Sequence, residues 1–244
     1  MIVGFMASGE SGKSKCAEIL ADELGFTRVS YTEPIITVLY EINPIVLVTP
    51  EDYQKVIKEM EWKQASQFYD MRINNYGGFY YFRDLHVFLG YDVSKRIKMV
   101  REYYQRAGTE AGRNLYGQDV WINLAEKKFD KSENVVIENV RFENEALSVL
   151  RKDGFLVKIN RPGFGNINNH ISDTGIPYHL ATHTLENDGT VADLPQKVRD
   201  LYHLLDAETN SLQKTNFIKE KVIKELEKIK TEFEAEKIQN KGLR

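Results

Sequence analysis

The stretch MIVGFMASGESGKSKCAEIL, residues 1–20, decides the fold. Its first six residues are apolar apart from one glycine, as expected of a central parallel strand that is buried on both faces. A loop containing two glycines follows, and a helical pattern then runs from Ser14 to Leu24 and ends at Gly25. Together with a second predicted strand over residues 26–31, this order opens a doubly wound α/β fold with a central parallel sheet flanked by helices.

The loop over residues 9–14, Gly-Glu-Ser-Gly-Lys-Ser, has the composition of a phosphate-binding loop. Its glycines let the backbone bend so that successive N–H groups face phosphate oxygens, and the following helix directs its positive end at the same place. We expect Lys13 to reach the outer phosphates and the Ser14 hydroxyl to hold Mg²⁺. The predicted ATP-binding residues are Gly9, Glu10, Ser11, Gly12, Lys13 and Ser14.

Ala7 stands where such loops usually have their first glycine. Alanine is unfavourable there only if the residue needs a positive φ angle. Because Ala7 opens the turn out of the strand, we expect a negative φ. The Gly-Lys-Ser part is intact, and the sequence therefore predicts a working nucleotide site.

The bulk composition narrows the class of protein. A net charge of −3 argues against binding a nucleic-acid polymer by bulk attraction, and no run approaches the length of a membrane span. The chain has one cysteine, Cys16, which we expect to be a packing residue. There is no signal-peptide pattern, and a reducing cytoplasm fits best.

A second set of candidate site residues follows the predicted strand Val135–Ile137. Ligands of open α/β sheets bind beyond the carboxyl ends of the strands, so Glu138 is a candidate to order the metal and Arg141 to reach phosphate. The residue that orders the metal could instead be Asn139. Glu145 could orient Arg141 or contact the acceptor, and the alternative is a surface ion pair between the two.

A third cluster lies in REYYQRAGTEAGRNLYGQDVW, residues 101–121. Arg106 and Arg113 are seven residues apart and share one face if the helix continues. Gly108 and Gly112 allow close backbone approach, which suits a second phosphate-bearing ligand. A solvated basic face is the alternative.

The remaining pattern predicts one domain over residues 1–206, with a mainly helical insertion at about 32–113. A polar, glycine-rich lid is expected at about 161–179, and residues 207–244 are predicted to form a charged amphipathic helix. That helix could pack on its own domain, bind a helical partner or make a homodimer. Further expected elements are helices at 117–129, 143–154 and 191–206 and strands at 155–161 and 183–187.

These motifs, in this order, resemble the bacteriophage family of deoxynucleoside monophosphate kinases, within the nucleoside monophosphate kinase group. The resemblance covers roughly residues 1–205, and its most specific parts are Gly-Thr-Glu-x-Gly-Arg and the acidic-x-x-Arg-Phe-x-Asn-Glu run. The chain departs from the family at Ala7, and at Glu138 and Asn139, where aspartates are more frequent.

The resemblance implies Mg²⁺- and ATP-dependent phosphorylation of a deoxynucleoside monophosphate. By matching positions, Lys13 and Ser14 serve the donor, and Arg141 and Glu145 lie at the reacting phosphates and the acceptor. Arg113 and Trp121 belong to the motif near the acceptor pocket, and the segment from Arg161 to Asp173 corresponds to a lid.

Phosphoryl transfer needs positioning and charge stabilisation, and arginines are required to offset the repulsion between two anions. On this ground Arg113, Arg141 and Arg161 are candidates, with Lys13, Arg141 and Arg161 as the predicted catalytic set. Two alternatives use the same scaffold: a kinase for another small acceptor, such as a nucleoside or a coenzyme A precursor, and a nucleotide-binding regulatory module. The accepted base is left open, because tyrosines of the insertion could stack on it or pack in the core (Tyr76, Tyr80, Tyr81, Tyr103 and Tyr104).

Overall fold

The computed structural model describes residues 1–7, 11–59, 77–127, 134–163 and 176–212. The chain begins with the predicted strand, loop, helix and strand, which are β1 (Ile2–Met6), α1 (Lys13–Leu24) and β2 (Thr27–Val29). Gly25 ends α1 in the left-handed region with φ 72°, where its N–H donates to the carbonyl of Ala21. A left-handed C-cap of this kind favours glycine because a Cβ would be strained there.

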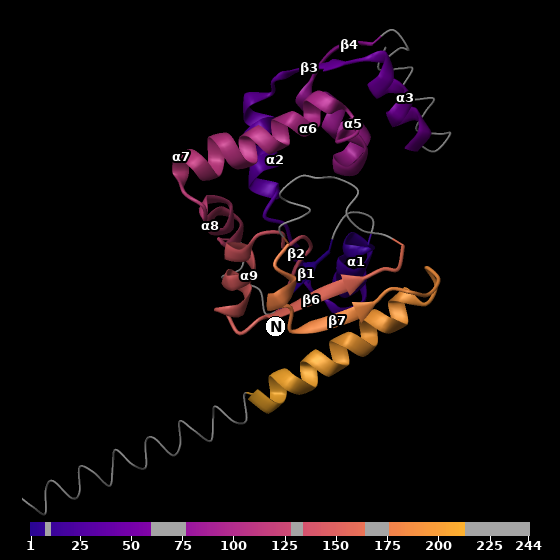
Figure 1. Ribbon diagram of the computed structural model, residues 1–244, viewed down its shortest axis with the longest axis vertical. Coiled ribbons are helices and arrows are strands. Elements are labelled where there is room, and N and C mark those ends of the chain that lie inside the picture. Colours follow the sequence, from indigo (N-terminus) through magenta and orange to yellow (C-terminus); the bar gives the residue numbers. More distant parts are fainter. Residues whose placement is uncertain (8–10, 60–76, 128–133, 164–175, 213–244) are drawn as a thin grey trace, which may run out of the picture. The chain divides into compact units, whose positions relative to one another are not determined.

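The main sheet has five parallel strands in the order β2-β5-β1-β6-β7. The three strands beyond the first two are β5 (Val135–Ile137), β6 (Phe155–Asn160) and β7 (His183–Glu186). β1 lies in the middle, with Gly4 in register with Ile137 on one side and Leu156 on the other. Since all strands are parallel, their carboxyl ends meet at one edge, and the loop after β1 opens there between β5 and β6 (Figure 1).

The central strands β1, β5 and β6 are mainly apolar because helices cover them. All three residues of β5 are buried, as are four of the five residues of β1. Helix α1 contacts β1, β2 and β5, while α9 (Glu143–Leu150) contacts β1 and β6. The predicted α/β fold with a parallel sheet flanked by helices is confirmed.

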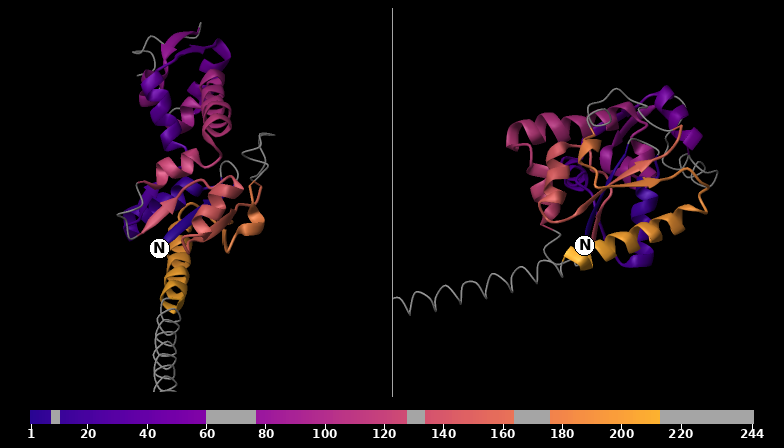
Figure 2. Two further views of the ribbon diagram at one scale, coloured as in Figure 1. Left: turned by 90° about the vertical axis from the view of Figure 1, so that its left-hand side faces the viewer. Right: turned by 60° about the horizontal axis from the view of Figure 1, so that its bottom comes forward.

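Between β2 and β5 the chain forms an insertion with its own apolar core, built around Leu85, Val100 and Tyr104. Figures 1 and 2 show α2, α5 and α6 grouped together, with the β3–β4 pair at one end of the group. The insertion's elements are α2 (Glu33–Ile42), β3 (Ile45–Val48), α3 (Pro50–Glu59), β4 (Gly78–Tyr81), α5 (Phe82–Ser94), α6 (Lys98–Gln105), η1 (Arg106–Arg113), α7 (Asn114–Tyr116) and α8 (Val120–Glu126).

The prediction of a mainly helical insertion missed the antiparallel pair β3–β4. β3 is a run of four apolar residues, and periodicity cannot distinguish so short a run from a piece of buried helix. Its partner lies about thirty residues further on, with Ile45 paired to Tyr81, and no local signal links the two.

The Gly-Thr-Glu-Ala-Gly-Arg motif lies in a π-helix, η1, set between α6 and α7. π-helical turns hydrogen-bond from residue i to i+5 and are frequent at functional sites. Here Gly112 makes room for Trp121, whose indole N–H donates to the Gly108 carbonyl at 2.7 Å. A Cβ on Gly112 would overlap the same indole ring, so glycine is required at that position.

The described residues fall into two compact units, one within residues 2–187 and one that begins at Asp188 and includes Met1. In the second unit a helix covers residues 194–212, and the turn before it is closed by Asp193, whose carboxylate accepts from the Thr190 N–H and hydroxyl. The predicted division after residue 206 and the limits of the insertion and the lid stay predictions. Among the described residues, no helix combines the length and apolar character needed to cross a membrane.

We expect Gly112→Ala to lower the free energy of unfolding by about 1–3 kcal/mol, because the added methyl group overpacks the core against Trp121. Gly108→Ala is the matched control in the same π-helix. Its Cβ would lie 3.1 Å from the end of the Ile35 side chain, which can turn aside. Urea unfolding followed by circular dichroism measures both variants, and equal losses would contradict this account of Gly112.

Candidate active site

The phosphate-binding loop is followed directly by α1. Gly12 has φ 96°, which explains why the residue before the lysine is glycine. Lys13 is buried, and its Nζ donates to the Ala7 carbonyl at 2.8 Å, while Ser14 in the first turn is exposed. The expected negative φ at Ala7 is confirmed, since the described non-glycine residues with positive φ all lie outside this loop.

Gly9 and Glu10 of the predicted ATP-binding set lie outside the described residues. The second half of the loop is held by a residue that follows the edge strand β7. The side-chain amide of Asn187, which follows β7, donates to the Ser11 carbonyl at 2.9 Å, and its backbone N–H donates to the Asn160 carbonyl. Asn187 therefore links the loop to the ends of β6 and β7.

Glu138 follows β5 as predicted, and it forms an ion pair that the sequence does not reveal. Its carboxylate accepts from Arg28 Nε at 2.9 Å, with 21% of the Glu138 side chain and 40% of the Arg28 side chain exposed. The shared hydrogen bond raises the pKa of Arg28 above its ordinary value. The carboxylate keeps a second oxygen, so Glu138 remains a fitting donor for a hard cation.

Asn139 serves a different contact. Its Oδ1 accepts from the Ser30 hydroxyl at 3.2 Å, and its Nδ2 donates to the Thr32 hydroxyl at 3.0 Å. Both hydroxyls belong to the connection from β2 into α2. Asn139 thus ties the turn after β5 to the point where the insertion leaves the sheet.

Glu145 is the centre of the most buried polar contact of the site. One carboxylate oxygen accepts from Arg113 Nη2 at 2.7 Å, and the other accepts from the backbone N–H groups of Arg141 and Phe142, at 2.8 and 3.2 Å. Only 3% of the Glu145 side chain and 8% of the Arg113 side chain is exposed. The Arg113 guanidinium also stacks on the Phe142 ring, 4.0 Å from its centroid.

Burial is the main influence on this pair. It raises the pKa of Glu145 and lowers that of Arg113, because low dielectric surroundings disfavour both charged forms. The backbone N–H groups and the opposite charges act against those shifts. Arg113 Nε is buried without a hydrogen-bond partner among the described residues.

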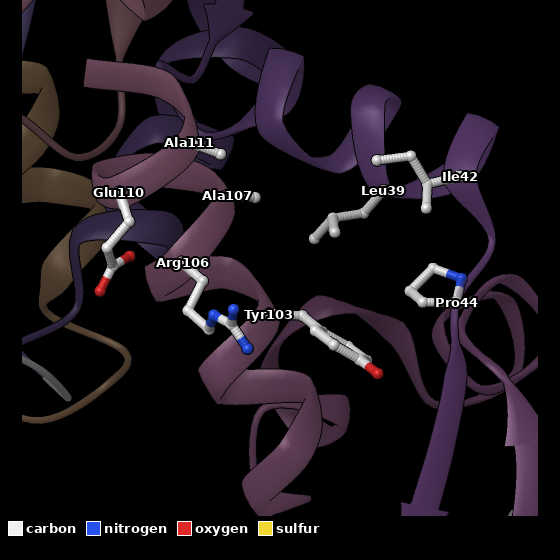
Figure 3. A pocket seen from close by; sticks show the side chains of 8 residues that line it. All are labelled: Leu39, Ile42, Pro44, Tyr103, Arg106, Ala107, Glu110 and Ala111. Carbon is white, nitrogen blue, oxygen red and sulfur yellow. The ribbon is translucent and has the colours of Figure 1, made fainter. Parts of the chain in front are cut away.

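The two arginines of the π-helix have different surroundings. Arg113 is buried on Glu145, whereas Arg106 is exposed and lines a pocket of about 300 Å³ between α2 and the α6–η1 segment. Figure 3 shows Arg106 extending toward Tyr103 at this pocket. Its lining residues are Leu39, Ile42, Pro44, Tyr103, Arg106, Ala107, Glu110 and Ala111.

The remaining predicted residues are placed as follows. Arg141 lies four residues beyond the end of β5, and Arg161 directly follows β6, so both stand at the carboxyl edge on either side of β1. Trp121 is buried in the core of the insertion, 4% exposed. Most of the predicted lid, residues 164–175, lies outside the described residues, as do residues 213–244 of the C-terminal helix.

Sequence reasoning missed Arg28, Asn187 and the Ser30–Thr32 pair as parts of this edge. Asn187 directly follows β7, Ser30 and Thr32 follow β2, and Arg28 lies within β2, and these positions were the signal available. Their partners are 107 to 176 residues distant in the chain, which hides the pairing from local patterns.

Comparisons with known proteins agree with the motifs. A family model described as deoxynucleotide monophosphate kinase matches residues 91–198, which include η1, Arg141 and Arg161. The putative deoxynucleotide monophosphate kinase of Acanthamoeba polyphaga mimivirus is 25% identical over 179 residues, 71% of this chain and 80% of that protein. The deoxynucleoside-5'-monophosphate kinase of Escherichia phage T5 is 25% identical over 228 residues, 77% of this chain and 89% of the phage protein. The resemblance seen in the motifs is thereby confirmed.

Among solved structures, a dephospho-CoA kinase from Campylobacter jejuni aligns with a TM-score of 0.38 and 14% identity, over 85% of this chain and 98% of that chain. This similarity is slight. The assignment of the fold therefore depends on the strand order and the loop described above.

Cys16, in α1 directly behind the loop, is fully buried, and burial raises the pKa of its thiol to about 12. At pH 8 the thiolate, which is the reactive form, is then on the order of one part in ten thousand. We expect iodoacetamide to label the native chain at least ~100-fold more slowly than the urea-unfolded chain, by mass spectrometry, with the rate rising as the pH approaches that pKa. Equal rates for the native and unfolded chains would show that α1 does not protect the thiol.

Proposed function

We propose that this chain transfers the γ-phosphoryl group of ATP to the 5'-phosphate of a deoxynucleoside monophosphate. A bond forms between an acceptor phosphate oxygen and the γ-phosphorus, the bond to the β,γ-bridging oxygen breaks, and ADP and the deoxynucleoside diphosphate leave. The observation that carries the proposal is a phosphate-binding loop set between the arginine-bearing ends of β5 and β6, in a chain similar to viral deoxynucleotide monophosphate kinases.

The donor would bind at the loop. The first turn of α1 supplies backbone N–H groups and the positive end of the helix dipole, which favour phosphate. Lys13 Nζ lies over the beginning of the loop, and it can exchange its bond to the Ala7 carbonyl for one to a phosphate oxygen. We assign Mg²⁺ to the Ser14 hydroxyl and the Glu138 carboxylate; when bound it neutralises charge on the β- and γ-phosphates.

We assign Arg141 and Arg161 to the transferring phosphate. Acceptor phosphate oxygens are already anionic, so a general base is not required, and the protein's contribution is to offset repulsion between the two nucleotides. Arginine suits this task because its planar guanidinium can bind two phosphate oxygens at once.

The acceptor would extend into the insertion. The pocket beside Arg106 has mainly apolar walls and a tyrosine at Tyr103, with one cationic side chain, Arg106, and one carboxylate, Glu110. Its apolar part fits a flat base. Trp121, which is buried, would act on the acceptor indirectly by holding η1. We place the reaction in the cytoplasm, where ATP and deoxynucleotides are available.

An acceptor screen tests the proposal. The chain is incubated with ATP, Mg²⁺ and each of a panel of deoxynucleoside monophosphates, ribonucleoside monophosphates, nucleosides and dephospho-coenzyme A, and ADP formation is measured. We expect strong stimulation by one or more deoxynucleoside monophosphates. Stimulation by a nucleoside or dephospho-coenzyme A alone would favour a different kinase, and slow hydrolysis indifferent to the acceptor would favour a regulatory module.

We expect Lys13→Ala and Arg141→Ala each to lower kcat at least ~100-fold, because each removes a positive charge from the reacting phosphates. Lys15→Ala and Arg151→Ala are the matched controls. Lys15 is an exposed residue of the same helix as Lys13, paired with Glu18, and Arg151 is an exposed arginine after α9. Near-normal turnover in Arg141→Ala would remove that residue from the reaction.

A further inference from the structure

The turn after β5 contacts both connections between the sheet and the insertion. The insertion leaves the sheet after β2, where Ser30 and Thr32 bind the Asn139 amide. It returns through η1 and α8, where Arg113 binds Glu145. The contact of Asn139 with Thr32 joins segments about a hundred residues apart, and the contact of Arg113 with Glu145 joins residues 32 positions apart.

A third contact on the return connection involves Asn144. Its Nδ2 donates to the Gln118 carbonyl at 3.0 Å and to the Asp119 carboxylate at 2.8 Å, in the segment between α7 and α8. Asn139, in the turn after β5, and Asn144 and Glu145, in the first turn of α9, therefore hold the two connections, and Arg141 lies between them in sequence.

The Glu145 carboxylate directly connects the insertion to Arg141. One of its oxygens holds a guanidinium of the insertion, and the other holds the backbone of Arg141 itself. With both groups bound to one rigid, buried carboxylate, a displacement of η1 is transmitted to the Arg141 backbone. The Arg113 side chain is 8% exposed and stacked on Phe142. In this structure it therefore connects η1 to Glu145 and is not presented to solvent.

We infer that Asn139 and Glu145 are positioning residues for phosphoryl transfer, which hold the acceptor-binding insertion in register with Arg141. The inference rests on the proposed function. It assigns Glu145 an indirect role in place of acceptor contact, and it assigns Asn139 to the orientation of the insertion and not to the metal. Reacting groups must be aligned closely, and a misplacement of about 1 Å far from the chemistry can cost about 100-fold in rate.

The test compares Glu145→Gln with Glu143→Gln in the full chain. Glu143 is an exposed carboxylate of the same first helical turn, so the control removes an equal charge without affecting the Arg113–Glu145–Arg141 contacts. We expect Glu145→Gln to lower kcat/KM for the deoxynucleoside monophosphate about 100-fold, while KM for ATP stays unchanged. Glu143→Gln should behave as the wild-type chain.

Asn139 provides a second variant that does not depend on the buried ion pair. Asn139→Ala should lower kcat/KM for the acceptor at unchanged Mg²⁺ dependence, whereas a metal-ordering role would raise the Mg²⁺ concentration that is required. Asn139→Asp should restore activity, because a carboxylate can accept from both the Ser30 and Thr32 hydroxyls. All variants are assayed well below their melting temperatures, so that a purely structural role would lower Tm and leave these constants unchanged.

The wild-type chain is measured in the same assay. Absence of transfer there would overturn the proposed function and the inference with it. Two outcomes would overturn the inference while leaving the proposed function intact. In the first, the wild-type chain transfers phosphate and kcat/KM for the acceptor is unchanged in Glu145→Gln and Asn139→Ala. In the second, these variants change only the Mg²⁺ dependence.

Discussion

The buried contact between Arg113 and Glu145 is the constraint on which the rest of the site depends. Two opposite charges taken out of water are tolerated only when each is hydrogen-bonded in good geometry, and removing one partner of such a pair typically costs about 3–5 kcal/mol. Here the carboxylate satisfies that condition with one guanidinium N–H and two backbone N–H groups. The same bonds fix the turn after β5, so the requirement for stability also sets the geometry of the site.

Polar contacts lie on both sides of the predicted phosphate-binding loop at the carboxyl edge of the sheet. On one side Arg28 pairs with Glu138 and the Asn139 amide binds the start of the insertion. On the other side Asn187 fixes the Ser11 carbonyl. The parallel strands bring these groups together because most of them follow strands whose carboxyl ends meet at this edge. The edge is therefore where the fold can combine residues from distant parts of the chain.

Local patterns were sufficient to predict the parts of the fold whose cause is local. The strand Val135–Ile137 and the helix ended by Gly25 are as expected, since continuous apolar runs and a C-terminal glycine determine them. The β3–β4 pair and the Arg28–Glu138 ion pair were not predicted, because both depend on residues that meet only after folding. For the site, the loop and the strand-end residues could be located from sequence. The π-helical geometry around Arg113 could not, because Gly112 leaves room for Trp121 without indicating it.

The π-helix places a limit on insertions and deletions. Successive residues of any helix point in different directions around its axis, so the loss of one residue between Arg106 and Arg113 would change how the later side chains of the segment are directed relative to the earlier ones. Arg113 would then face away from the Glu145 carboxylate, and the Gly108 carbonyl would no longer meet Trp121. The number of residues in this segment is accordingly as important as their identity, and related chains that keep the ion pair should keep the spacing between its arginine and the preceding glycines.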